Sequence, residues 1–166
     1  MAEAGVFGED DRVELVEGEV IDMSPIGSRH AACVDRFNRL LVPALAVRAI
    51  VRVQSPVRLD DLSEPQPDLA VLRPRPDFYA GAHPGPDDVV VVVEVADTTS
   101  GWDRRVKVPL YGRAGVAEAW VVDLAEQVVY VFRGPGRDGY GEEVRLGRGE
   151  RLEALDVTFG VDEILG

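Results

Sequence analysis

The sequence has little cysteine and no long apolar segment. A single cysteine, Cys33, excludes an internal disulfide and any metal site built from several thiolates. No run of about eighteen or more apolar residues is present, so the sequence predicts no membrane-spanning helix. The opening segment, MAEAGVFGEDDRVE, lacks the basic start and the apolar centre of a signal peptide. We therefore expect a cytoplasmic protein.

Positive charge is also scarce. The chain has 18 Lys and Arg against 30 Asp and Glu, which gives a formal net charge of -12. Because phosphate contacts need clustered Lys and Arg, this balance argues against a general affinity for nucleic acid. The dipeptide Arg104-Arg105 is too short to form a basic patch. Nucleic acid would need a narrow positive cleft or a partner that delivers it.

In other respects the composition is that of an ordinary globular domain. The 166 residues are 46% apolar and 29% charged, which is enough to build one core. We find no internal repeat and no low-complexity tract. We expect a single domain over residues 1–166, with residues 1–12 poorly ordered.

The N-terminal third predicts a hairpin followed by a helix. RVELVEGEVIDMS is typical of two short strands joined at Glu17-Gly18. We expect the helix to have Ser28 as its N-cap and to end or kink at Pro43. Its apolar residues recur at helical spacing from His30 onwards: Val34, Phe37, Leu41 and Leu45.

The rest of the chain predicts mostly strands. Extended segments are expected at AIVRVQ, DLAVL, the valine run of 89–93, AEAWVVDL, EQVVYVFRG, EEVRL and near Thr158, with a last helical turn at VDEIL. A helix is expected from about residue 103 to 114, ended by Gly115, with Val106, Leu110 and Ala114 towards the sheet. This order predicts an α/β (α+β) fold in which a single mixed β-sheet is flanked by helices.

The valine run ends unexpectedly in a carboxylate, Glu94. A β-branched run of this length is typical of a strand buried on both faces. An unpaired carboxylate in such a place would cost several kcal/mol. Glu94 must therefore have a partner.

Asp68 and Lys107 are the other charged residues that stand out by position. Asp68 opens the DLAVL strand, and Lys107 lies on the helix that follows Glu94. If the two strands are neighbours, Asp68 and Glu94 could share one Mg²⁺ or Mn²⁺ ion, since magnesium takes one or two carboxylates and keeps several waters. Lys107 could then orient or deprotonate a water, or stabilise charge on a phosphate.

A structural interpretation of the same residues stays open at this point. Asp68 would cap a turn, and Glu94 would form a buried pair with an arginine. Lys107 would be a solvated helix residue, held by an exposed pair with Asp103 that contributes only ~0.3 to 0.5 kcal/mol.

The motifs in their order resemble a known family. ELVEGEVIDMSP, His30 near a helix start, QPDLAVL, VVVEV and DRRVKVPLYGRAGVAEAWVVD together resemble the Uma-two family, a bacterial family assigned to the endonucleases. The resemblance covers roughly residues 13 to 160. It implies a restriction-endonuclease-like core of the PD-(D/E)XK superfamily. It also implies a magnesium-dependent endonuclease that hydrolyses phosphodiester bonds of nucleic acid, with DNA as the expected partner.

The resemblance assigns roles to three residues. Asp68 and Glu94 correspond to the metal-binding acids, and both are expected to be catalytic together with Lys107. The superfamily's strand lysine is replaced by Ala96, and the family pattern supplies it from the next helix, where Lys107 stands. Pro109 follows two residues later and is expected to bend that helix and shift the lysine.

Three further residues are secondary candidates. Glu14 matches an acidic position of the family's hairpin, as does Glu19, although both also fit a solvated hairpin edge. His30 could contact a phosphate or a metal, or be a polar surface residue. Gln66 fits a hydrogen bond near the site or an ordinary loop position. Tyr111 and Trp120 are interpreted as core aromatics and not as base-stacking platforms.

Two other functions remain alternatives at this stage. One is a catalytically weak or inactive binding or regulatory module, favoured by Ala96 and Pro109. The other is a hydrolase of small phosphorylated molecules, for which the net charge of -12 is less unfavourable. Exposed strands such as EQVVYVF are candidates for a homodimer contact.

Overall fold

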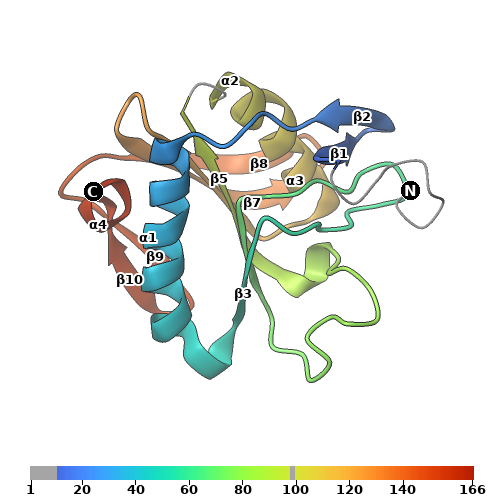
Figure 1. Ribbon diagram of the computed structural model, residues 1–166, viewed down its shortest axis with the longest axis horizontal. Helices are drawn as coiled ribbons and strands as arrows, with labels where there is room; N and C mark the ends of the chain where they lie inside the picture. The colour runs from blue at the N-terminus through green and yellow to red at the C-terminus, as the bar shows by residue number, and fades with distance from the viewer. Residues whose placement is uncertain (1–10, 98–99) are drawn as a thin grey trace.

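A six-stranded mixed sheet forms the centre of the protein (Figure 1). The computed structural model describes residues 11–97 and 100–166. Strand β5 is parallel to β6, and the other neighbours are antiparallel. In spatial order the strands are β3 (Ile50–Val53), β4 (Leu69–Leu72), β5 (Val89–Ala96), β6 (Glu118–Asp123), β7 (Val128–Gly136) and β8 (Gly139–Leu146). The predicted fold class, a mixed sheet flanked by helices, is confirmed.

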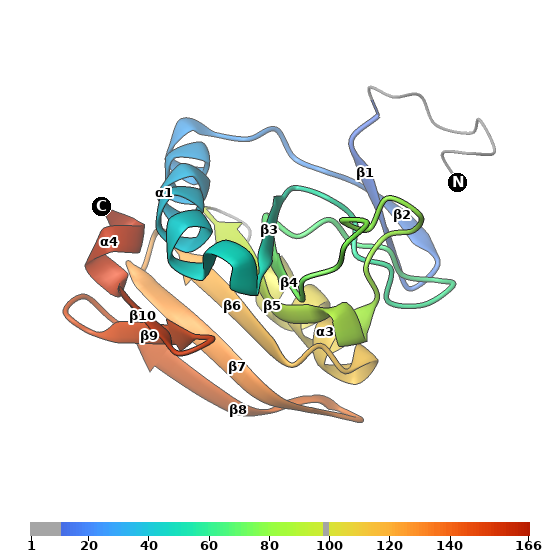
Figure 2. The ribbon, with the colours of Figure 1, turned by 90° about the horizontal axis from the view of Figure 1, so that it is seen from below.

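Helices cover both faces of the sheet (Figure 2). Helix α1 (Ser28–Leu45) and the short α4 (Val161–Leu165) lie on one face. The crossover from β5 to β6 lies on the other, and it contains α2 (Ser100–Trp102), the π-helix η4 (Asp103–Lys107) and α3 (Val108–Ala114). Two short 3₁₀ helices are η2 (Ala46–Arg48) and η3 (Pro86–Asp88).

Two hairpins lie outside the sheet, so the single predicted sheet does not hold all the strands. The first is β1 (Val13–Val16) with β2 (Glu19–Asp22), and the second is β9 (Arg151–Ala154) with β10 (Val157–Gly160). The first has φ of 50° at Glu17 and 85° at Gly18, the positive pair that a two-residue I′ turn needs. It was predicted, whereas β9 was not. The four residues of β9, RLEA, are too few to reveal the alternation of apolar and polar side chains that is typical of a strand.

Strand β5 contributes to two separate cores. Val91, Val93 and Val95 pack on the α1 side with Phe37 and Trp120. Val92 and Ala96 pack on the α3 side. Because side chains alternate along a strand, Glu94 falls on the α3 side. The valine run was therefore correctly interpreted as a strand buried on both faces.

The predicted N-cap of α1 was wrong, and so was an end of the helix at Pro43. The helix begins at Ser28, and Gly27, with extended backbone, is its N-cap. Pro43 lies inside the helix, which continues to Leu45. Because Pro43 is close to the end, it removes one backbone donor while the apolar face that includes Phe37 and Leu41 stays packed. Gly115 ends α3 as predicted, with φ of 91°.

The strand proposed for a dimer contact is not exposed. Strand β7, which contains VVYVF, pairs with β6 on one side and β8 on the other, and its first five residues are buried. This basis for a homodimer was therefore wrong. Residues 1–12 were predicted to be poorly ordered. Apart from Asp11 and Arg12, these residues lie outside the part of the chain that the structure describes. In the described residues no helix is long and apolar enough to cross a membrane.

Candidate active site

Asp68 and Glu94 meet where β4 begins and β5 ends. The two strands are neighbours, with Leu69 opposite Val93 in an antiparallel ladder. Asp68 immediately precedes β4, and its Oδ2 accepts a hydrogen bond from the Val95 backbone N–H at 2.8 Å. The side chain is thus fixed to the backbone of the strand that carries Glu94. The predicted adjacency is confirmed, and Asp68 does more than cap its own turn.

Glu94 has two partners, both from the helix that follows it. Lys107 Nζ lies 2.7 Å from Glu94 Oε1. The hydroxyl of Tyr111 donates a hydrogen bond to the same oxygen at 2.6 Å. Glu94 is only 4% exposed, as is Lys107. Lys107 is therefore not a solvated helix residue, and the partner of Glu94 is not an arginine.

The helix reaches Glu94 through a widened turn. The Val108 N–H donates to the Asp103 carbonyl five residues earlier, which is the π-helical pattern. Pro109 comes directly after this turn, and its ring would otherwise clash with the carbonyl of Arg105, four residues before it. The widened turn accommodates the proline, and Lys107 stays in contact with Glu94. Such turns occur frequently at functional sites.

The same turn changes which residues face inward. Of the three predicted to face the sheet, Leu110 is buried, while Val106 and Ala114 are only partly buried against the same core. The most buried side chain of α3 is Tyr111. Tyr111 and Lys107 are four apart, so both lie on the helix face that meets Glu94.

Glu14 contacts the ammonium from the hairpin. Its Oε2 lies 3.1 Å from Lys107 Nζ and accepts the backbone N–H of Gln66 at 3.1 Å. Gln66 Nε2 donates to the Val13 carbonyl at 3.1 Å, which ties the hairpin to the loop before Asp68. The structure thus brings Glu14 into the site and makes Gln66 a support for it. Glu19 stays exposed.

His30 belongs to the site through Asp68. Its Nε2 lies 2.9 Å from Asp68 Oδ2, and this hydrogen bond raises the pKa of His30, against the lowering effect of burial. The other ring nitrogen, Nδ1, is buried and has no hydrogen-bond partner among the described residues. His30 is therefore a candidate for contact with a bound group and is not merely a surface residue.

Burial shifts the ionisation of the buried cluster. It raises the pKa of Glu94 to about 8, against the opposing effect of Lys107. Burial alone would lower the pKa of Lys107, but Glu94 and Glu14 raise it above the ordinary value. Burial and then Glu94 raise the pKa of Tyr111 well above its usual range. All three shifts keep protons on the cluster and so limit its negative charge.

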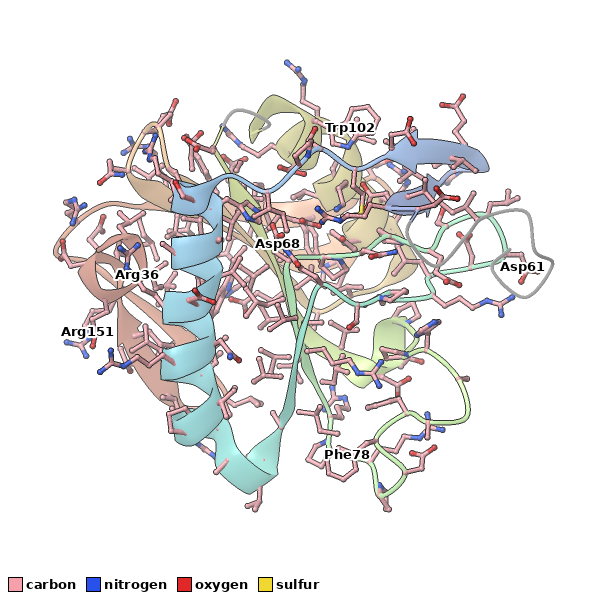
Figure 3. The ribbon with its side chains drawn as sticks, viewed as in Figure 1. Arg36, Asp61, Asp68, Phe78, Trp102 and Arg151 are labelled. Atoms are coloured by element: carbon pink, nitrogen blue, oxygen red, sulfur yellow. The ribbon has the colours of Figure 1, made fainter. Side chains whose placement is uncertain are left out.

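The carboxylates and the ammonium of this cluster, but not Tyr111, line one pocket of about 590 Å³. In Figure 3, Asp68 lies near the centre of the view and Trp102 lies towards the top. Arg12 and Met23 also line the pocket, and so does Asp103, which is 7% exposed and thus not in a surface pair. All six candidate residues, Glu14, His30, Gln66, Asp68, Glu94 and Lys107, share this pocket.

A family model matches residues 2–162, nearly the whole chain. The family is Uma2, with the description "Putative restriction endonuclease". This chain belongs to the Uma2 family.

Its fold is also found in a solved structure. The crystal structure of "a putative nuclease belonging to DUF820" from Anabaena variabilis is similar, with a TM-score of 0.75 and 13% sequence identity. The similarity covers 98% of this Uma2 chain and 94% of the other chain. At this identity the likeness establishes the fold. No curated protein matches the chain significantly.

The acids of this Uma2 chain fit a divalent cation of the magnesium type. Their hydrogen bonds and ion pairs to other described residues engage Oδ2 of Asp68 and Oε1 of Glu94. Within 11–97 and 100–166 no group of three or more His, Cys, Asp or Glu could hold a metal ion by itself. Magnesium needs only one or two carboxylates with water, whereas zinc needs a fuller set of protein ligands.

Two members of the site were missed from the sequence. Tyr111 was interpreted as a core aromatic, yet its hydroxyl binds Glu94. Asp103 was considered only as the exposed partner of Lys107 in the structural interpretation, and it is buried and lines the pocket. The signal was present, because Asp103, Lys107 and Tyr111 recur every four residues and so lie on one helix face.

Proposed function

We propose that this protein is a divalent-metal-dependent nuclease that hydrolyses phosphodiester bonds of nucleic acid, with DNA as the first substrate to test. The observation that carries the proposal is the 2.7 Å contact between Lys107 and Glu94 inside the pocket that also holds Asp68. A structural ion pair would not require the further acids, Asp68 and Glu14 among them, that line the same pocket. Membership of the Uma2 family supports the same reaction class.

In this proposal Asp68 and Glu94 hold the metal. Magnesium or manganese, when bound, would stabilise the negative charge that develops on the phosphate and activate a water. The Val95 N–H keeps Asp68 oriented, and the Tyr111 hydroxyl keeps Glu94 oriented. Lys107, held charged by Glu94 and Glu14, positions the attacking water or stabilises the phosphate oxygens.

The test is a cleavage assay on DNA and RNA with Mg²⁺ and with Mn²⁺. The wild-type chain is expected to cut, and Asp68→Ala is expected to lose both cleavage and metal-linked thermal stabilisation. Asp61→Ala is the matched control, since the Asp61 side chain is 93% exposed and lies outside the pocket. Absence of both cleavage and divalent binding at millimolar concentrations, measured by calorimetry, would contradict the proposal.

One observation favours a second candidate, a binding module without catalysis. Glu94 Oε1 already forms an ion pair with Lys107 and accepts a hydrogen bond from Tyr111. The chain's own groups therefore supply polar partners for this buried carboxylate without a metal ion. A module of this kind would bind nucleic acid without divalent ions and would leave it intact. Metal titration separates the two, and a panel that includes small phosphate esters separates a nuclease from a small-molecule hydrolase.

A further inference from the structure

Trp102 lies exposed at the mouth of the pocket. It is 40% exposed and lines the same pocket as Glu94 and Lys107. The other tryptophan, Trp120, is 0% exposed in the core beneath α1. Packing therefore explains Trp120 but does not explain why a large aromatic ring stands at the opening of a charged pocket.

Other apolar side chains complete the opening. Ile26, in the segment before α1, is 39% exposed and lines the pocket. Three more come from β2 and the same segment: Ile21, Met23 and Pro25. Together with Trp102 they form an apolar rim around a polar floor. A flat apolar group with a polar attachment would fit such a rim and floor.

The charge of the floor restricts what can enter. Among the described residues that line the pocket, three are basic: Arg12, His30 and Lys107. Six are acidic: Glu14, Asp22, Asp68, Glu94, Asp97 and Asp103. Duplex DNA, with about one negative charge per 1.7 Å, would meet repulsion across this opening. Affinity for a substrate must come largely from contacts that do not depend on charge.

We propose that Trp102 stacks on an unpaired nucleobase beside the phosphodiester presented to Lys107, so that the protein acts on single-stranded nucleic acid. This rests on the proposed function and narrows its substrate class. Aromatic side chains bind every base through its ring face, and this contact is insensitive to charge. The pocket volume of about 590 Å³ lies in the range of sites for small ligands, which suits one splayed nucleotide.

The test uses the emission of the two tryptophans. In a Lys107→Ala background with Mg²⁺, which keeps the strand intact, a single-stranded oligothymidylate is expected to quench Trp102. A duplex of the same length and an abasic strand are expected to quench little. Adding Trp102→Phe leaves Trp120 as the sole emitter and so measures the background. If Lys107→Ala does not fold, the wild-type chain in EDTA serves for the same titration.

A labelled strand measures affinity independently. By anisotropy, Trp102→Ala is expected to weaken strand binding about 5- to 150-fold, the range for losing one base–aromatic stack. Trp102→Phe is expected to stay within about threefold, because a ring remains. Phe78→Ala is the matched control, since Phe78 is 66% exposed and does not line the pocket.

The outcomes separate this inference from the function on which it rests. Equal binding of duplex and single strand, or unchanged affinity of Trp102→Ala, overturns it even if the wild-type chain cuts DNA. Strand binding that depends on Trp102 supports it even if no cleavage is found, in which case the proposed reaction fails instead.

Discussion

Strand β5 separates two interiors that differ in kind although they share its backbone. On the α1 side Val91, Val93 and Val95 meet a core that is apolar throughout. On the α3 side the apolar core gives way, at Glu94, to a buried group of opposite charges. Because side chains alternate along β5, moving by one residue along the strand, from Val93 to Glu94, leads from the apolar core to the charged group.

The difference teaches how a charged site can be placed inside a small protein. The α1 side holds the strand by packing, which is non-directional and tolerates changes of shape. The α3 side holds it by hydrogen bonds and ion pairs, each of which requires a particular partner. A substitution on the first side should therefore affect stability alone, and one on the second side should affect chemistry as well.

The largest contrast is expected between adjacent residues of β5. Glu94→Gln keeps the volume but removes a proposed metal ligand, and it should lower cleavage on the order of 10³-fold or more. Val93→Ala should lower the free energy of unfolding by about 2 kcal/mol and leave cleavage per folded molecule unchanged. Rates at matched folded fractions, with unfolding in urea, test both. Equal losses of cleavage in the two variants would contradict the division of roles.

The next contrast concerns Lys107 and Leu41. Lys107→Ala leaves Glu94 and Glu14 without their cation and should cost about 3–5 kcal/mol, with loss of cleavage but retained metal binding. Leu41→Ala, on the α1 side, should cost a similar 2–5 kcal/mol by leaving a cavity.

Double variants separate these two causes. Adding Glu94→Gln to Lys107→Ala should recover part of the lost stability, because one uncompensated charge disappears. Adding Glu94→Gln to Leu41→Ala should be additive, since the sites lie on opposite sides of the sheet. Additivity in both pairs would mean that the Lys107–Glu94 ion pair has no energetic role.

A smaller contrast is expected between the buried Tyr111 and the partly buried Tyr140. Tyr111→Phe removes a donor from a carboxylate and should cost about 1.5–3 kcal/mol. Tyr140→Phe removes a donor from the Val116 carbonyl, at 2.8 Å, and should cost about 0.5–1.5 kcal/mol. Urea unfolding measures both, and Tyr111→Phe should also lower cleavage. An equal cost in both variants would argue that Tyr111 does not donate to an ionised carboxylate at Glu94.

The smallest effect is expected from His30 and depends on pH. Asp68 raises the pKa of His30 in the folded state, so this residue adds stability that is fully present below about pH 6.5. The contribution is lost as pH rises through the raised pKa. The difference in unfolding free energy between wild type and His30→Gln, measured in EDTA, should therefore shrink with rising pH. His83→Gln, at an exposed loop position, is the matched control.

Most of the fold followed from local patterns that are strong in this sequence. Three features were each predicted from a single local property, and the structure has all three: the turn at Glu17-Gly18, the strand of the valine run and the helix end at Gly115. The limits of α1 and the strand β9 did not follow. Capping by Gly27 and the pairing of four residues depend on neighbours that local periodicity does not contain.

That the candidate residues lie together could be predicted from the sequence, whereas several of their contacts could not. Asp68, Glu94 and Lys107 were identified from position and resemblance, and the structure brings them to one pocket. That Tyr111 would donate to Glu94 could not be deduced from its aromatic character, because a tyrosine at a buried helical position fits a core equally well. The hydroxyl contact depends on the relative position of helix and strand.

The widened turn of Asp103–Lys107 affects how proteins with this arrangement of charged residues can be recognised from their sequences. In the proposed function the catalytic lysine is carried on the crossover helix, so position 96 of the strand is free to hold alanine, which packs in the core. The lysine and Glu94 are then neighbours in the fold, but they do not form a Glu-x-Lys triplet in the sequence. A search for Glu-x-Lys along one strand would pass over this chain, whereas a search for an ammonium near a strand-end carboxylate would find it.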